Sequence, residues 1–212
     1  MTFRFLAVEG PIGVGKSSLV ARLAEKLDAR KVLENVENPF LHDFYRDRAG
    51  AAFQAQLVFL LNRYQQQREL AQEDLFAQRT ISDYLFAKDK IFAYLNLGDS
   101  ELLIYERLYA MLEPSVPRPD LVIYLQADTE VLVERVAGRR REVESEISEA
   151  YLNEVNKAYN HFFFRYDATP LLVIDTSSID FVHHEADLSD LVEKIRSMDR
   201  GVQYYVPLGK SR

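Results

Sequence analysis

The sequence has 212 residues, of which 48% are hydrophobic and 28% are charged, and its formal net charge is −7. This composition indicates a globular chain rather than a disordered one. The acidic balance argues against a nucleic-acid partner, because non-specific binding to phosphodiesters requires a basic surface. The lack of cysteine excludes disulfides and thiolate zinc sites. No stretch resembles a signal peptide or a membrane span of roughly 18 apolar residues, so we expect a cytoplasmic protein with no membrane partner.

Short apolar runs alternate with helical patterns along the chain. In chain order we expect a strand at 3–8, a helix at 16–27, a strand at 31–36, a long helix at 51–75, a strand that begins at 80 and ends near Asp83, helices at 87–95 and 101–112, a strand at 120–126, helices at 131–141 and 151–166, a strand at 170–176 and a helix at 187–197. Asp128 or Thr129 is the expected cap of the helix at 131–141.

Strands that alternate with helices predict an α/β fold with a parallel sheet, here of five strands flanked by helices. The continuous apolar run at 120–126 is typical of a strand that is buried on both faces. The tail after residue 200 fits an edge strand or an extended arm, and both alternatives stay open. With no repeat or linker in the sequence, we expect a single domain over residues 1–212.

Residues 7–18, AVEGPIGVGKSS, contain the pattern of a phosphate-binding loop (P-loop) between a strand and a helix. Glycines in such a loop let backbone N–H groups face phosphate oxygens. Lys16 would reach the β- and γ-phosphates of a nucleotide, and the Ser17 hydroxyl would ligate Mg²⁺. The alternative is a plain glycine turn. The residues expected at ATP are Gly10, Gly13, Val14, Gly15, Lys16, Ser17 and Ser18.

Two carboxylates lie at the ends of expected strands, Glu34 in KVLE and Asp83 in TISD. Ligands of a doubly wound sheet bind outside the carboxyl ends of its strands, so both side chains are expected to face the P-loop. A carboxylate there can take the proton of a hydroxyl acceptor or hold the waters of Mg²⁺. The alternative for each is an ordinary carboxylate at a strand–helix junction.

A basic cluster, RVAGRRREVE, begins at Arg135. Arg135 and Arg139 are four residues apart and share a helix face, and Arg141 follows closely. Such cations can stabilise a transferred phosphoryl group, although arginines also suit an exposed helix C-terminus. Beside a P-loop, the cluster favours an arginine-rich lid over residues 138–149.

Gln56 and Arg63 lie seven residues apart in the long helix, on one face and among apolar neighbours. A glutamine amide presents the paired donor and acceptor that can read the edge of adenine. A core hydrogen bond is the more common role of such a pair.

Taken together, these segments resemble the deoxynucleoside kinases, the family that includes deoxycytidine, deoxyguanosine and bacterial deoxyadenosine kinases. After the P-loop, the resemblance rests on ENVENPFLHDFY, FQAQLVFLLNR, SDYLFAKDKIFA, RPDLVIYL and RVAGRRREVESEISEAYL, which cover most of the chain. It implies a P-loop kinase fold. NPFL followed by FY is similar to the bacterial purine-nucleoside branch.

The resemblance also implies roles for single residues. Glu34 matches the general base, and Gln56, Arg63 and Asp89 match the residues that read the base. Tyr45 and Glu144 match contacts to the sugar 3′-hydroxyl, and Phe92 in KDKIFA is a candidate for stacking on the base. Arg135, Arg139 and Arg141 match the lid arginines. Asp83 matches the acidic residue of the Glu/Asp-Arg-Ser motif, and with Ser17 is the expected Mg²⁺ site.

The sequence departs from the family at three places. The arginine expected after Asp83 is Tyr84, so a cation near the 5′-oxygen is missing and its replacement stays open. The usual Arg-Gly-Arg of the lid reads Arg-Arg-Arg. The segment from Glu34 to Asn38 is one residue shorter than in many relatives, which leaves Glu37 as a rival for the base.

The function implied by this resemblance is transfer of the ATP γ-phosphate to the 5′-hydroxyl of a deoxynucleoside, with Mg²⁺. Deoxyadenosine is favoured, followed by deoxycytidine or deoxyguanosine. Relatives pair through their long helices, so a homodimer is expected. One alternative is a thymidylate-type monophosphate kinase, which would need a further cationic site for the phosphate of its acceptor. The other is a non-catalytic nucleotide-binding scaffold, which is suggested by Tyr84 in place of the arginine.

Overall fold

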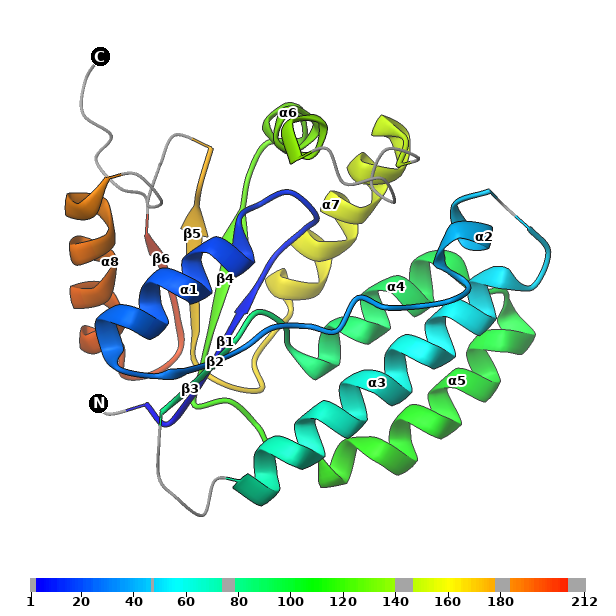
Figure 1. Cartoon of the computed structure of the whole chain (residues 1–212), viewed down its shortest axis with the longest axis horizontal. Coiled ribbons are helices and arrows are strands. Elements are labelled where there is room, and N and C mark those ends of the chain that lie inside the picture. Colours follow the sequence, from blue (N-terminus) through cyan, green and yellow to red (C-terminus); the bar gives the residue numbers. More distant parts are fainter. Residues whose placement is uncertain (1–2, 47, 74–78, 140–146, 178–183, 206–212) are drawn as a thin grey trace.

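Within the described residues, six parallel strands form a central sheet that is covered by helices on both faces (Figure 1). The structure is a computed structural model and describes residues 3–46, 48–73, 79–139, 147–177 and 184–205. The strand order is β2-β3-β1-β4-β5-β6. The strands are β1 Phe5–Glu9, β2 Arg30–Val32, β3 Thr80–Ser82, β4 Leu121–Gln126, β5 Leu171–Asp175 and β6 Val202–Tyr205.

The parallel α/β class is confirmed, but the expected number of five strands was wrong by one. The sixth strand, β6, pairs in parallel with β5, with Val202 opposite Leu171. It is a four-residue edge strand in which exposed and half-buried side chains alternate. Such a strand lacks the continuous apolar run that marks buried strands such as β4.

The second strand ends earlier than expected, whereas the third ends one residue before Asp83, close to the expected end. β2 ends at Val32, so Glu34 follows the strand by two residues instead of ending it. β3 ends at Ser82, and Asp83 follows directly. Both carboxylates still lie beyond the carboxyl ends of their strands.

Two layers of helices bury the two faces of the sheet. Side chains of α1 and α8, including Leu19 and Leu191, pack with Leu6 and Ile123 on one face. On the other face, α4 and α7 pack against strand side chains that point the opposite way, such as Val122 next to Ile123 in β4. The helices are α1 Lys16–Leu27, α2 Leu41–Tyr45, α3 Ala51–Glu73, α4 Asp89–Asn96, α5 Asp99–Leu112, α6 Thr129–Arg139, α7 Glu149–Phe164 and α8 Glu185–Ser197.

Helices α3 and α5 lie beyond α4 and extend the molecule to one side of the sheet (Figure 1). Leu60 of α3, Ala93 of α4, and Tyr105 and Tyr109 of α5 form a separate buried cluster. No helix in the described part of the chain is both long enough and apolar enough to cross a membrane.

The strand order places a crevice at the carboxyl end of β1. From β1 the chain crosses to β2 on one side, whereas β4, β5 and β6 lie on the other. Ligands of open α/β sheets bind at such a reversal of strand order. Because neighbouring strands are parallel, the segments that follow β1, β2 and β3 leave the sheet at the same end of the strands.

Candidate active site

The P-loop predicted from the sequence turns between the end of β1 and the start of α1. Gly13 has a φ of 89°, and Gly15, at the N-cap of α1, has a φ of 104°. These values lie in the left-handed region that other residues rarely adopt. A Cβ atom on Gly13 would lie 2.9 Å from Cγ2 of Val136 in α6. The loop therefore depends on glycine, and the N-terminus of α1, which favours anions, opens onto it.

The ammonium of Lys16 lies against this loop. Its Nζ donates hydrogen bonds to the backbone carbonyls of Gly10, at 2.6 Å, and Pro11, at 3.1 Å. Burial and the nearby charge of Lys88 lower the pKa of Lys16 to about 8. The side chain is therefore still mostly protonated at neutral pH and can pair with phosphate oxygens.

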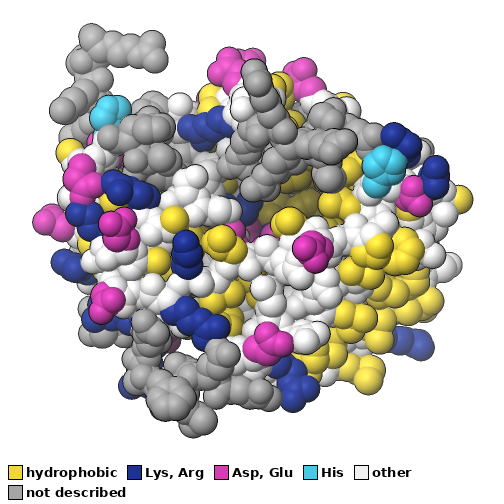
Figure 2. Space-filling view, viewed as in Figure 1, with side chains coloured by type: hydrophobic (Ala, Val, Ile, Leu, Met, Phe, Trp, Pro, Cys, Tyr) yellow, Lys and Arg dark blue, Asp and Glu magenta, His cyan; other side chains and the backbone are white. Residues whose placement is uncertain are grey.

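A pocket of about 550 Å³ lies next to the P-loop at the carboxyl edge of the sheet, where the space-filling view shows a hollow (Figure 2). Its size is in the range of small-ligand sites. The structure brings nine of the predicted site residues to its wall: Gly13, Lys16, Ser17, Glu34, Tyr45, Gln56, Arg63, Asp83 and Phe92. The remaining loop residues, Gly10, Val14, Gly15 and Ser18, shape the P-loop but are not among the residues that line the pocket.

Glu34 is held between two cations in the wall of this pocket. Arg63 donates from Nε to Oε1 at 2.6 Å, and Lys88 donates from Nζ to Oε2 at 2.6 Å. Burial alone would raise the pKa of Glu34, but the two cations lower it to about 2. Glu34 is therefore an ionised carboxylate with a fixed orientation. Its rival, Glu37, is exposed and is not among the residues that line the pocket.

Asp83 links the P-loop to the segment that carries Glu34. Its Oδ2 accepts a hydrogen bond of 2.6 Å from the Ser17 hydroxyl, and its Oδ1 accepts one of 2.6 Å from the backbone N–H of Glu34. A hydroxyl and a carboxylate side by side at a P-loop fit Mg²⁺, which takes one or two oxygen ligands from the protein and the rest from water and phosphates.

Asp89 lies behind the pocket wall in a fully buried network. It accepts hydrogen bonds from the Gln56 amide at 2.6 Å and the Tyr105 hydroxyl at 2.9 Å, and forms an ion pair with Arg63. It is not among the residues that line the pocket. Gln56 and Arg63 are therefore the members of the predicted base-reading set that face the pocket, and Asp89 fixes both of them.

Aromatic side chains from four helices contribute to the apolar wall of the pocket. Phe92 of α4 meets Tyr159 of α7 edge-on, with ring centroids 6.0 Å apart. Tyr45 of α2 meets Tyr151 of α7 in the same manner, at 6.4 Å, and Phe59 of α3 is a further wall residue. Rings around a narrow pocket suit a planar base.

Two charged residues near the site, Glu9 and Lys88, were not predicted from the sequence. Glu9 is fully buried at the end of β1, and its carboxylate accepts hydrogen bonds from the backbone N–H groups of Gly10 and Leu85. The strand-end position that selected Asp83 would also have selected Glu9. Lys88 lines the pocket one residue before Asp89, and its sequence neighbourhood gives no periodic signal.

Part of the predicted lid lies outside the described residues. Arg135 of α6 lies beside the P-loop, where its guanidinium donates to the carbonyls of Thr176 at 2.7 Å and Val14 at 3.4 Å. Arg139 is the last residue of α6. The predicted lid residues 140–146, with Arg141 and Glu144, are among those that the structure does not describe.

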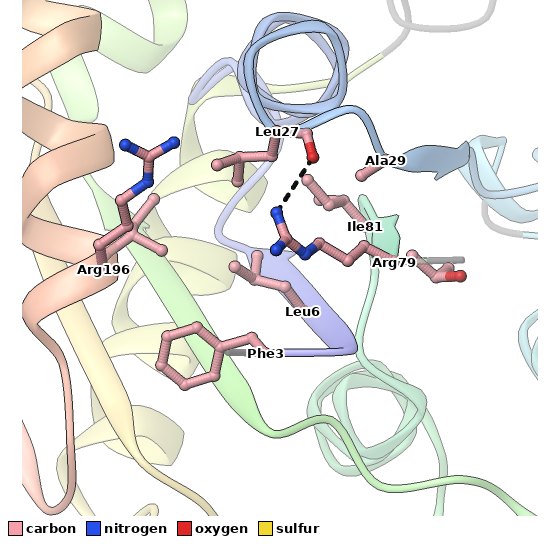
Figure 3. Close-up of a pocket in the computed structure, with 9 residues that line it drawn as sticks. Phe3, Leu6, Leu27, Ala29, Arg79, Ile81 and Arg196 are labelled. Carbon is pink, nitrogen blue, oxygen red and sulfur yellow. Dashed lines mark hydrogen bonds between the residues drawn. The ribbon is translucent and has the colours of Figure 1, made fainter. Parts of the chain in front are cut away.

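A second pocket, of about 330 Å³, lies at the opposite end of the strands, near the start of β1 (Figure 3). It is lined by Phe3 and Leu6 near the start of β1, and by Arg79 and Arg196. Arg79 donates to the carbonyl of Leu27 at 3.3 Å. The described residues that line it include no carboxylate and so do not offer the acid–base chemistry found beside the P-loop.

Comparisons with known proteins agree with this geometry. A model of the family described as deoxynucleoside kinase matches residues 6–198. The chain is 32% identical to the deoxyguanosine kinase of Bacillus subtilis (strain 168), over 93% of this chain and 98% of the relative. It is 30% identical to the deoxyadenosine/deoxycytidine kinase of the same organism, over 91% of this chain and 92% of the relative.

A solved structure of a deoxynucleoside kinase is also similar to this chain. The deoxyadenosine kinase of M. mycoides with the products dCMP and dCDP bound is similar with a TM-score of 0.77 and 26% identity, over 92% of this chain and all of that chain. The expected P-loop kinase fold is therefore confirmed. With a P-loop and a fixed carboxylate in one pocket, the chain belongs to the deoxynucleoside kinase family and is an ATP-dependent phosphotransferase.

Proposed function

We propose that this protein transfers the γ-phosphoryl group of ATP to the 5′-hydroxyl of a deoxynucleoside. The observation that carries the proposal is the position of Glu34, an ionised carboxylate in the same pocket as Lys16 and Ser17 of the P-loop. A base beside the donor site can take the proton of an acceptor hydroxyl as its oxygen attacks phosphorus. One of the products bound to the M. mycoides kinase, dCMP, is a deoxynucleoside 5′-monophosphate, the class of product that such a transfer forms.

The residues around Glu34 have separate roles in this proposal. Lys16 binds the β- and γ-phosphates, and the lid arginines, Arg135, Arg139 and Arg141, neutralise charge on the triphosphate. Ser17 and Asp83 would hold Mg²⁺, which shields the phosphate charge when bound. Positioning and electrostatics supply most of the catalysis in phosphoryl transfer.

We propose deoxyadenosine as the preferred acceptor, followed by deoxycytidine or deoxyguanosine. The support is the pairing of Gln56 with Asp89 at 2.6 Å, which fixes the amide that would read the base edge. Phe92 would stack on the base, and Tyr45, with Glu144, would contact the 3′-hydroxyl. Relatives in Bacillus subtilis divide between deoxyguanosine and deoxyadenosine/deoxycytidine, so the base preference requires its own measurement.

The test is phosphoryl transfer from Mg·ATP to the four deoxynucleosides and their monophosphates. We expect transfer to one or two deoxynucleosides, reduced about 10²- to 10⁴-fold by Glu34→Gln, which removes the base. Glu37→Gln is the matched control and is expected to leave the rate unchanged, because Glu37 is exposed. Transfer only to monophosphates would indicate a thymidylate-type kinase, and ATP binding without transfer would indicate a scaffold.

We further propose a single-domain protein that forms a homodimer in the cytoplasm, where ATP and nucleosides are available. The domain assignment is supported by one sheet that contains strands from Phe5 to Tyr205. The dimer is supported by exposed hydrophobic side chains on α3 and α5, here called the helical face: Leu61, Leu103, Ile104 and Met111. Figure 2 shows hydrophobic side chains gathered over these helices.

A further inference from the structure

The buried ammonium of Lys88 is a charged group that the proposed roles leave unused. Lys88 is 3% exposed and lies in the wall of the pocket beside the P-loop. Its Nζ is 2.6 Å from Oε2 of Glu34 and 3.8 Å from Oε1 of Glu9. A buried lysine is unfavourable unless it is paired, so these two carboxylates account for its position.

The backbone around Lys88 is fixed by one of the same carboxylates. Lys88 ends the 3₁₀ helix η2 (Phe86–Lys88), where its N–H donates to the carbonyl of Leu85 at 3.0 Å. The N–H of Leu85 in turn donates to Oε1 of Glu9 at 2.8 Å. Glu9 thus binds the N–H at the start of the turn and lies within ion-pair distance of the ammonium at its end. The side chain that reaches Glu34 is therefore carried by a hydrogen-bonded turn.

The other cations near Glu34 already have partners. Arg63 is bound to Oε1 of Glu34 and to Asp89. Lys16 is bound to the carbonyls of the P-loop. Tyr84, which replaces the arginine of the family motif, is fully buried, uncharged at neutral pH and not among the residues that line the pocket. Among the described residues of the pocket wall, Lys88 is the cation that pairs with Oε2 of Glu34, whereas Arg63 pairs with Oε1.

A hydroxyl that donates its proton to Oε2 of Glu34 shares that oxygen with the Lys88 ammonium, so the two groups are neighbours. We propose that Lys88 acts on the acceptor oxygen and the transferred phosphoryl group, and thereby replaces the cation lost at Tyr84. This inference rests on the proposed function. In the step, the 5′-oxygen bonds to the γ-phosphorus, the bond from phosphorus to the β–γ bridging oxygen breaks, and Glu34 takes the proton. Lys88 stays protonated and stabilises the charge that develops.

The first experiment compares Lys88→Met and Lys88→Arg with the unsubstituted protein. We expect Lys88→Met to lower kcat about 10²- to 10³-fold, the usual effect of losing one charge-stabilising donor, while KM for the nucleoside changes less than about threefold. Lys88→Arg keeps the charge and should recover at least about tenfold over Lys88→Met. Lys90→Met is the matched control, because Lys90 lies over the ring of Tyr109, away from the pocket.

A double-variant cycle separates a direct role from one exerted through Glu34. If Lys88 only positions Glu34, Lys88→Met costs nothing further in a Glu34→Gln background. The proposal requires a further loss of at least about tenfold in that background, measured with radiolabelled ATP.

A third variant covers the case in which Lys88→Met does not fold. Because the sequence has no cysteine, Lys88→Cys introduces a single thiol. Alkylation with 2-bromoethylamine restores an ammonium of similar length, and iodoacetamide adds a neutral group. Recovery of kcat by the ammonium alone supports the proposal, and equal rates for both adducts overturn it. If the unsubstituted protein phosphorylates no deoxynucleoside, the proposed function fails and the inference fails with it. If it does, but Lys88→Met keeps its kcat, the inference alone fails.

Discussion

The Ser17 hydroxyl donates a hydrogen bond of 2.6 Å to Asp83, which joins the first turn of α1 to the end of β3. The two residues are 66 positions apart in the sequence. They meet because β1 and β3 are parallel neighbours whose carboxyl ends lie at the same edge. The P-loop and the acceptor pocket are thus held together by the two residues proposed to bind Mg²⁺.

The first prediction concerns this pair. Asp83→Asn removes the negative charge but keeps the shape of the side chain, so we expect the Mg²⁺ concentration for half-maximal activity to rise about tenfold or more. The measurement is a Mg²⁺ titration at fixed ATP. Asp199→Asn, at an exposed position after α8, is the control. An unchanged Mg²⁺ requirement would contradict the assignment of Asp83 as a ligand.

The second prediction concerns Arg63, which pairs with both Glu34 and Asp89. Arg63→Met leaves two buried carboxylates without their shared cation, so the free energy of unfolding should fall by about 3–5 kcal/mol in urea denaturation. Arg68→Met on the same helix is the control. Arg68 is exposed, and its loss should cost less than about 1 kcal/mol. Equal effects of the two substitutions would show that the network contributes little to stability.

The site illustrates what the sequence could and could not predict. The P-loop glycines, Glu34 and Asp83 are placed by local pattern, since a glycine motif or a strand end marks each of them. Lys88 and Tyr159 are not marked in this way. They reach the pocket because η2 and α7 pack across the sheet, which is a property of the tertiary structure.

The strands show the same division. β4 is buried on both faces, and its continuous apolar run could therefore be recognised. β6 lies at the edge, and exposed side chains such as Tyr204 make it resemble an arm. Only its pairing with β5 distinguishes the two alternatives.

The third prediction is a pH dependence of stability. Burial would raise the pKa of Glu34, but Arg63 and Lys88 lower it from 4.5 to about 2. A lowered carboxylate pKa contributes stability that is present above pH 4.5 and is lost as the pH falls toward 2. The difference in unfolding free energy between the unsubstituted protein and Glu34→Gln should therefore narrow, by about 1 kcal/mol between pH 7 and pH 4. Urea denaturation at both pH values measures it, and a constant difference would refute the prediction.

The fourth prediction compares two glycines. Gly13→Ala places a Cβ atom 2.9 Å from Val136 at a φ of 89°, so it should destabilise the protein by about 1–3 kcal/mol and weaken ATP binding. Gly138 lies in α6, and no atom of the described residues lies within 4 Å of an added Cβ. Gly138→Ala should stabilise the protein by up to about 1 kcal/mol, because alanine favours helices. Thermal unfolding measures both, and shifts of Tm in the same direction would contradict the backbone explanation.

The fifth prediction concerns the helical face. Leu103 and Met111 of α5 are 54% and 75% exposed, which is unfavourable in a monomer when such side chains gather on one surface. The double variant Leu103→Glu/Met111→Glu should therefore shift the protein from twice its 24.6 kDa chain mass to a single chain in sedimentation experiments. Phe164→Glu, at an 83% exposed position at the end of α7, is the control and should leave the dimer intact. A monomeric unsubstituted protein, or a dimer that survives the double variant, would exclude this interface.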